Sequence, residues 1–124
     1  MGVLARQLKK KPDGNISPDS IRPDGTQKQK GWLGVLKGKN PDGKTFEATE
    51  YSTQSNAIKV DNKRVDFPTL VPTLTKEEIK KMLDDIIPHK KPIPESIMQK
   101  AITHARSRIE AGQSPFASNN ESPK

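Results

Sequence analysis

The chain has 124 residues, of which 30% are hydrophobic, and it carries a formal net charge of +7. This length suffices for one small domain and excludes two. The absence of cysteine excludes disulfides and thiolate metal sites, and no apolar run approaches the roughly 18 residues that cross a bilayer, so we expect no membrane contact.

Most of the positive charge lies near the start of the chain. Residues 1–44 carry ten Lys or Arg against four acids, whereas residues 45–124 carry twelve against eleven. Residues 1–30 also hold few large apolar side chains and contain two Pro-Asp-Gly turns. Such a segment buries too little surface to offset its ordering entropy. We therefore expect residues 1–30 to form an extended basic arm.

A compact domain is expected over residues 31–117, and it begins with a β-hairpin. Residues 32–36 are typical of a short strand, and the Pro-Asp-Gly sequence at residues 41–43 predicts a turn. Alternating side chains then predict a second strand over residues 45–51.

A second hairpin is expected to follow. Residues 57–60 and 64–67 flank an Asp-Asn-Lys turn, and their inner face would carry Ile58, Val60, Val65 and Phe67. Two prolines, Pro68 and Pro72, bracket the next segment. Because proline cannot donate to a strand ladder, this segment is an edge strand or an irregular crossing.

Two helices close the predicted domain. Thr75 and Glu78 form a capping box at the start of the first helix, and Pro88 ends it. The second helix is expected over residues 95–111, with an inward apolar stripe of Ile97, Ala101, Ile102, Ala105 and Ile109. We thus expect an α+β fold, with a small antiparallel sheet of two hairpins packed against two C-terminal helices. A loose polar tail over residues 118–124 would follow.

The sequence offers little support for catalysis. His89, in the linker between the helices, and His104, on the flank of the second helix, lack metal-ligand spacing. The acid pairs at residues 77–78 and 84–85 are assigned to the solvent face of the first helix. No nucleotide-binding or nucleophile motif is present, and the core is too small to build a substrate pocket. We expect no enzyme, no cofactor and no metal.

The expected binding residues are two aromatic side chains and the cations of the arm. The single tryptophan, Trp32, is either a core plug or an anchor for a partner. The arm either lies along a protein surface, contacts phosphates or stays solvated, and no aromatic residues interleave its cations for base stacking. The predicted partner-binding set is Trp32, Phe116, Arg6, Lys9, Lys10, Lys11, Arg22, Lys28 and Lys30.

Several short pieces of the sequence form a distinctive pattern across residues 23–117. The most specific piece is Pro-Thr-Leu-Val-Pro-Thr-Leu-Thr at residues 68–75. The other pieces are Pro-Asp-Gly-Thr at 23–26, Lys-Gly-Trp-Leu-Gly-Val-Leu-Lys at 30–37, His-Ala-Arg at 104–106 and Gly-Gln-Ser-Pro-Phe-Ala at 112–117. Together these pieces resemble a small module found in tailed-phage genomes and in large phage polyvalent proteins.

The resemblance implies a virion-associated protein with no catalytic residues to carry over. We expect a minor structural protein that docks on a repeating capsid, portal or neck, or tail protein of the phage, in an oligomeric state set by the assembly. Its expected location is the virion, and the host cytoplasm during assembly. One alternative is a basic nucleic-acid-associated phage protein that is packaged or ejected with the genome. Another is an accessory protein that regulates an enzyme.

Overall fold

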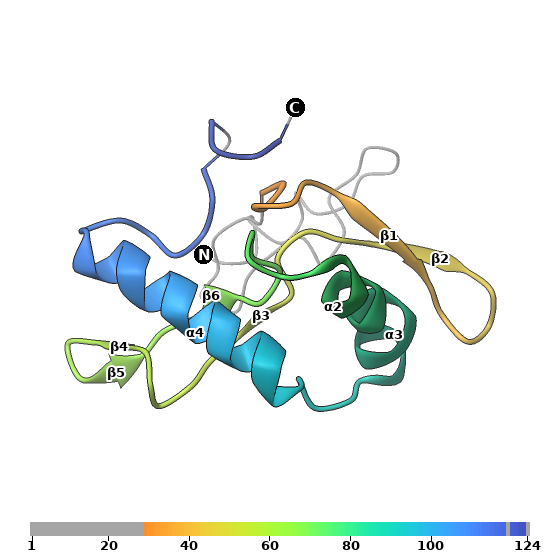
Figure 1. Cartoon of the computed structure of the whole chain (residues 1–124), viewed down its shortest axis with the longest axis horizontal. Coiled ribbons are helices and arrows are strands. Elements are labelled where there is room, and N and C mark those ends of the chain that lie inside the picture. Colours follow the sequence, from red (N-terminus) through yellow and green to blue (C-terminus); the bar gives the residue numbers. More distant parts are fainter. Residues whose placement is uncertain (1–28, 119, 124) are drawn as a thin grey trace, which may run out of the picture.

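The computed structural model describes residues 29–118 and 120–123 (Figure 1). All of the expected arm except Gln29 and Lys30 lies outside these residues. The strands are β1 Leu36–Lys39, β2 Thr45–Ala48, β3 Ser52–Thr53, β4 Lys59–Val60, β5 Lys63–Arg64 and β6 Phe67–Pro68. The helical segments are α2 Lys76–Lys81, η2 Met82–Ile86, α3 Ile87–His89 and α4 Glu95–Glu110.

The predicted α+β class is confirmed, with small antiparallel sheets and helices in one domain. The six strands pair as three separate two-stranded sheets, β1–β2, β3–β6 and β4–β5. Figure 1 shows β1–β2 beside α2 and α3 at one end of the domain, and β4–β5 near α4 at the other. Strand β6 contacts α4 directly, so the central β3–β6 pair connects the two ends.

The first hairpin begins later than expected. Residues 32–33 form a turn, and the strand starts only at Leu36. The cause is a pair of glycines in the left-handed region, Gly31 at φ +79° and Gly34 at φ +78°, a conformation that an extended strand does not tolerate. At Gly31 a Cβ atom would also lie only 2.1 Å from the carbonyl oxygen of Thr49, so only glycine fits there.

The second hairpin is shorter than predicted, and its inner face differs. Its turn is the two residues Asp61 and Asn62, both with positive φ, so Lys63 belongs to a strand and not to the turn. Ile58 and Phe67 are buried as expected, but Val60 is 41% exposed. The base of the hairpin packs on α4, but the hairpin extends beyond this helix. Each strand has only two residues, so Val60, next to the turn, has no hydrophobic cluster to pack against.

The proline-bracketed segment is an irregular crossing through the centre of the domain. Phe67, Thr69, Leu70 and Val71 have no exposed surface. The amide of Thr69 donates to the carbonyl of Glu50 at 3.0 Å, and its hydroxyl donates to the carbonyl of Tyr51 at 2.6 Å. These bonds satisfy polar groups that burial would otherwise leave unpaired.

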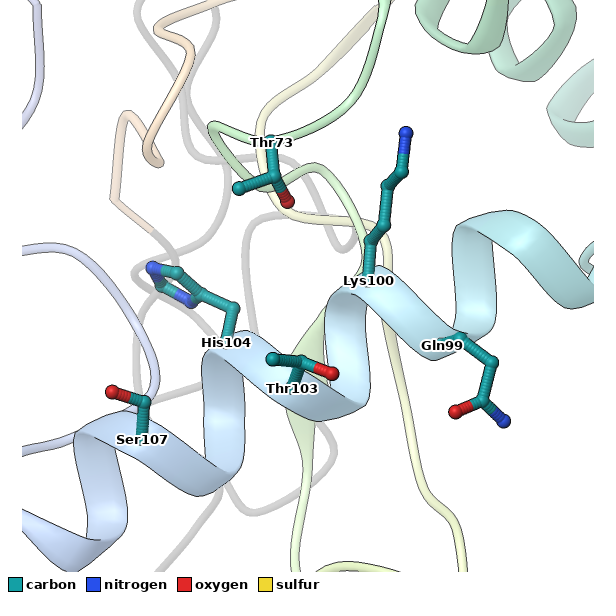
Figure 2. A pocket seen from close by; sticks show the side chains of 6 residues that line it. All are labelled: Thr73, Gln99, Lys100, Thr103, His104 and Ser107. Carbon is teal, nitrogen blue, oxygen red and sulfur yellow. The ribbon is translucent and has the colours of Figure 1, made fainter.

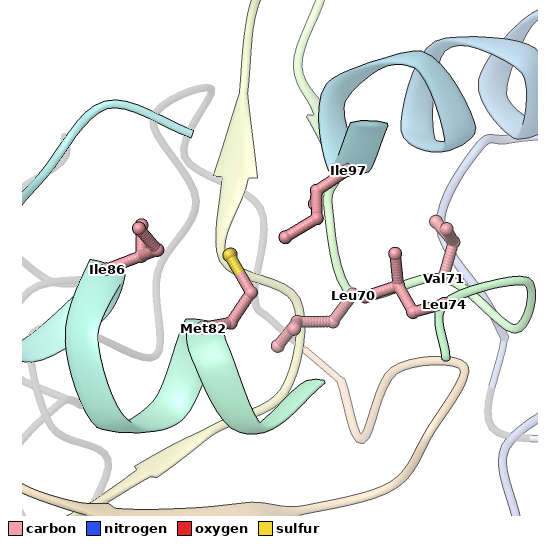
Figure 3. Packing of buried hydrophobic residues seen from close by; sticks show 6 residues of the cluster. All are labelled: Leu70, Val71, Leu74, Met82, Ile86 and Ile97. Carbon is pink, nitrogen blue, oxygen red and sulfur yellow. The ribbon is translucent and has the colours of Figure 1, made fainter. Parts of the chain in front are cut away.

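Two hydrophobic clusters meet at this crossing. One joins the crossing to η2 and to the start of α4, and it comprises Leu70, Val71, Leu74, Met82, Ile86 and Ile97 (Figure 3). The other packs the base of the second hairpin on α4, and it comprises Ile58, Phe67, Ala101, Ile102 and Ala105. Four of the five inward residues predicted for the second helix are buried, while Ile109 is only partly buried.

The first helix has the predicted start and a different end. Thr75 accepts from the amide of Glu78, whose carboxylate accepts in return from the amide of Thr75, so the capping box is confirmed. Pro88 lies inside the last turn and does not end the helix, which reaches His89. A proline in an α-helix clashes with the carbonyl four residues earlier. Here the preceding turn widens to a π-helix, in which the amide of Ile87 bonds to Met82, and this turn accommodates the ring.

The carboxylate of Glu78 ties the first helix to α4 and does not lie on the solvent face as expected. Its side chain is 15% exposed and contacts the ammonium of Lys100 at 2.6 Å. The hydroxyl of Ser96 donates to its second oxygen at 3.0 Å. Lys100 and the capping amide of Thr75 lower the pKa of Glu78 to about 2.

We expect Val71→Ala to lower the free energy of unfolding by about 2 kcal/mol, because it removes two methyl groups from a site without exposed surface. The same change at Val60, which is 41% exposed, is the matched control and should cost less than about 0.5 kcal/mol. Urea denaturation of both variants measures the difference. Equal losses would contradict the position of the crossing in the core.

We expect Glu78→Gln to destabilise the protein by about 1 kcal/mol at neutral pH, because it weakens a cap and an interhelical ion pair. The folded pKa lies below the ordinary value of 4.5. The contribution is therefore present above that pH and is lost as the pH falls towards about 2. Denaturation curves between pH 2 and pH 7 should converge at the acid end. Glu77→Gln, at an exposed neighbour, is the control, and a loss as large as that of Glu78→Gln would contradict the tie.

Candidate partner-binding site

The indole ring of Trp32 lies on α4, against two of its side chains. Its ring meets the His104 ring edge-on, with centroids 4.7 Å apart, and the guanidinium carbon of Arg108 lies 4.6 Å from its centroid. The indole nitrogen donates to the carbonyl of Pro115 at 3.0 Å. Trp32 is only half-buried, so it covers α4 and still presents part of its ring at the surface.

Arg108 fixes the C-terminal segment to the same place. Its two terminal nitrogens pair with the two carboxylate oxygens of Glu121 at 2.8 and 2.9 Å, and its Nε donates to the carbonyl of Ser114 at 2.8 Å. The guanidinium, together with the amide of Ser118, lowers the pKa of Glu121 to about 2. A bidentate pair of this kind is geometrically specific.

The expectation of a loose tail is therefore wrong for the part that the structure describes. Ser122 is 7% exposed, and its hydroxyl donates to the carbonyl of Gly31 at 2.7 Å, across 91 residues of sequence. Phe116 and Ala117, the last two residues of the expected domain, lead into this tail and are 9% and 2% exposed. A few polar contacts and one aromatic side chain hold the segment where its composition predicted none.

The predicted binding residues are only partly brought together. Trp32 and Phe116 both lie where the tail packs against the domain, and Phe116 leaves little surface for a partner. Lys30 is exposed and lies two residues before Trp32. The remaining predicted residues, Arg6, Lys9, Lys10, Lys11, Arg22 and Lys28, lie outside the described residues.

Beside Trp32, one flank of α4 forms a shallow pocket of about 410 Å³ that the sequence did not predict (Figure 2). The pocket is lined by Thr73, Gln99, Lys100, Thr103, His104 and Ser107. The five helical members recur at spacings of three or four residues, so a polar stripe on the second helix was the available signal. The ammonium of Lys100 is occupied by Glu78, and the pocket therefore offers mainly neutral hydrogen-bonding groups.

His104 contributes a partly buried imidazole to this pocket. Its Nδ1 atom is buried and has no hydrogen-bond partner among the described residues. Burial and the neighbouring Arg108 lower the pKa of His104, and Glu121 opposes that change. The ring is accordingly uncharged at neutral pH, which suits its contact with an indole that already holds one cation.

Within residues 29–118 and 120–123, no three His, Asp or Glu side chains gather into a group that could hold a metal ion. No helix in the same residues has the length and apolar character needed to cross a membrane.

We expect Glu121→Gln to loosen the tail and expose Trp32. Because Trp32 is the only tryptophan, its fluorescence reports this site alone. Its emission should shift to longer wavelength, and a neutral quencher should reach it more readily. Glu110→Gln removes the same charge from an exposed position at the end of α4 and serves as the control. Identical quenching in the two variants would contradict the role of the Arg108–Glu121 pair.

No family model matches this chain. Among curated proteins and solved structures, none matches it either.

Proposed function

We propose that this protein is a minor structural component of a tailed-phage virion, which docks on a repeating capsid, neck or tail protein through its domain and its basic arm. The resemblance of residues 23–117 to a phage module motivates the phage assignment. The observation that best supports docking through both parts is the fixed junction between arm and domain at Gly31.

Three contacts hold this junction. Gly31 is buried against Thr49, and its carbonyl accepts the hydroxyl of Ser122 at 2.7 Å. Two residues earlier, the amide of Gln29 donates to the buried carboxylate of Glu50 at 3.1 Å. The described chain therefore begins, at Gln29, in a defined place on the domain.

A fixed point of departure favours binding through two linked parts. Once the domain is bound, the residues before Gln29 are tethered next to the partner, which raises their effective concentration there. A repeating structural protein presents the neighbouring surface that such an arm would follow. Lys30 and the exposed part of Trp32 come soon after Gln29 in the chain, so a partner that follows the arm meets both.

The test uses particles of the phage that encodes the protein, analysed by quantitative mass spectrometry. Full-length protein should be present at a reproducible copy number. A chain without residues 1–22 should be incorporated less well and still fold, because the clusters of the core lie beyond residue 57. Particles that lack the full-length protein would overturn the virion assignment.

A second variant separates charge from length in the arm. It keeps the full length of the arm and replaces six of its cations with glutamine, at Arg6, Lys9, Lys10, Lys11, Arg22 and Lys28. Loss of incorporation in both variants would assign the contact to charge, and loss in the truncated chain alone would assign it to the arm's other groups. Normal incorporation of both would contradict any role of the arm.

A further inference from the structure

The β4–β5 hairpin is an exposed, basic projection at one end of the domain (Figure 1). All six residues from Lys59 to Arg64 are exposed, and three of them are cations. The single acid among them is Asp61, in the turn. No role was assigned to these cations from the sequence, because they are spread over a segment predicted to pack on the core.

The pairing register places like charges opposite one another. Lys59 is the direct partner of Arg64, so both side chains lie on the same face of the ribbon. Like charges directly opposite in an antiparallel pair are destabilising. Within residues 29–118 and 120–123, neither cation forms an ion pair. The β1–β2 hairpin shows the contrary arrangement, with Lys37 opposite Glu47.

A fourth cation lies at the base of the hairpin. The guanidinium of Arg106, on α4, donates to the carbonyl of Ala57 at 3.3 Å. The base itself is rigid, since Ile58 is 3% exposed and packs with Phe67 on α4. Asp66, the next acid along the chain, is buried and accepts from Gln54 at 2.7 Å, and among the described residues it forms no ion pair with the cations of the hairpin.

We propose that the β4–β5 hairpin, with Arg106 at its base, binds the phosphates of a nucleic-acid duplex. The faces of the ribbon decide between nucleic acid and an acidic protein. Lys63 pairs with Val60, so it lies on the face opposite to Lys59 and Arg64. A flat protein surface contacts one face of a ribbon, whereas the major groove of a duplex is wide enough to admit a two-stranded ribbon and has a phosphate backbone along each of its two walls.

The contact is independent of base sequence. Three of the six exposed side chains are those of lysine and arginine, which suit phosphate oxygens, and no aromatic residue of the hairpin is available to stack on a base. Binding an anion between Lys59 and Arg64 also removes the repulsion that the free hairpin carries. This site lies in residues 59–64 and 106 and not in residues 1–30, and it does not depend on the proposed docking to a virion protein.

The experiment measures binding of the full chain to a labelled DNA duplex by fluorescence anisotropy between about 50 and 200 mM salt. The test variant is Lys59→Gln with Arg64→Gln. Its control is Lys37→Gln with Lys39→Gln, which removes the same formal charge from the other hairpin. Both variants keep the arm, so any arm contribution is common to all three proteins.

The slope of log K against log salt should become shallower by about 1.8 in the test variant, since roughly 0.9 is lost for each phosphate contact. It should stay near the wild-type value in the control. Equal changes in the two variants, or no duplex binding at the lowest salt, would overturn the proposal. If the test variant lost as much affinity for polyglutamate as for the duplex, this result would also overturn the proposal, in favour of an acidic protein partner. A thermal melt verifies folding, and the test variant should melt no lower than wild type.

Discussion

The buried crossing over residues 67–71 is the constraint on which the rest of the domain depends. An irregular segment without exposed surface must find partners for its own amides and carbonyls, and a fold this small has few to offer. The chain just after β2 provides these partners, because the carbonyls of Glu50 and Tyr51 accept hydrogen bonds from Thr69. Once these bonds form, Phe67 points to one hydrophobic cluster and Leu70 to the other. The crossing thereby joins two clusters that would each be too small to hold the chain.

Charged side chains hold the periphery in a similar way. Glu78 joins the start of the first helix to α4 through Lys100, and Arg108 joins the end of α4 to the tail through Glu121. In both ion pairs the side chains are at least partly buried. Each pair therefore stabilises the fold more than the same two residues would in full contact with water. Together with the contact of Trp32 on α4, they order segments that carry too few apolar residues to pack by themselves.

The sequence predicted those features that local signals specify. The capping box at Thr75, the apolar stripe of α4 and the α+β class follow from spacing alone, and all are confirmed. Features that depend on distant residues were missed. The pairing of β3 with β6 has no local turn signal, and the bond between Ser122 and Gly31 spans 91 residues. Val60 was misplaced because alternation marks a face but does not say how far the core extends beneath it. The pocket on α4 was missed because it also needs Thr73, which only the tertiary fold brings to the helix.

The hydrogen bond between Ser122 and Gly31 also bears on whether the domain can be inserted into a longer polypeptide. Because the two ends of the folded part lie within one hydrogen bond of each other, they occupy the space that a short loop would need. A unit of this shape can be inserted into a surface loop of a larger polypeptide without pulling its ends apart, and its ends can be joined and reopened elsewhere. The hydrogen bond that orders the tail therefore keeps the two ends of the domain close enough for it to exist either as an independent protein or as an inserted domain of a longer chain.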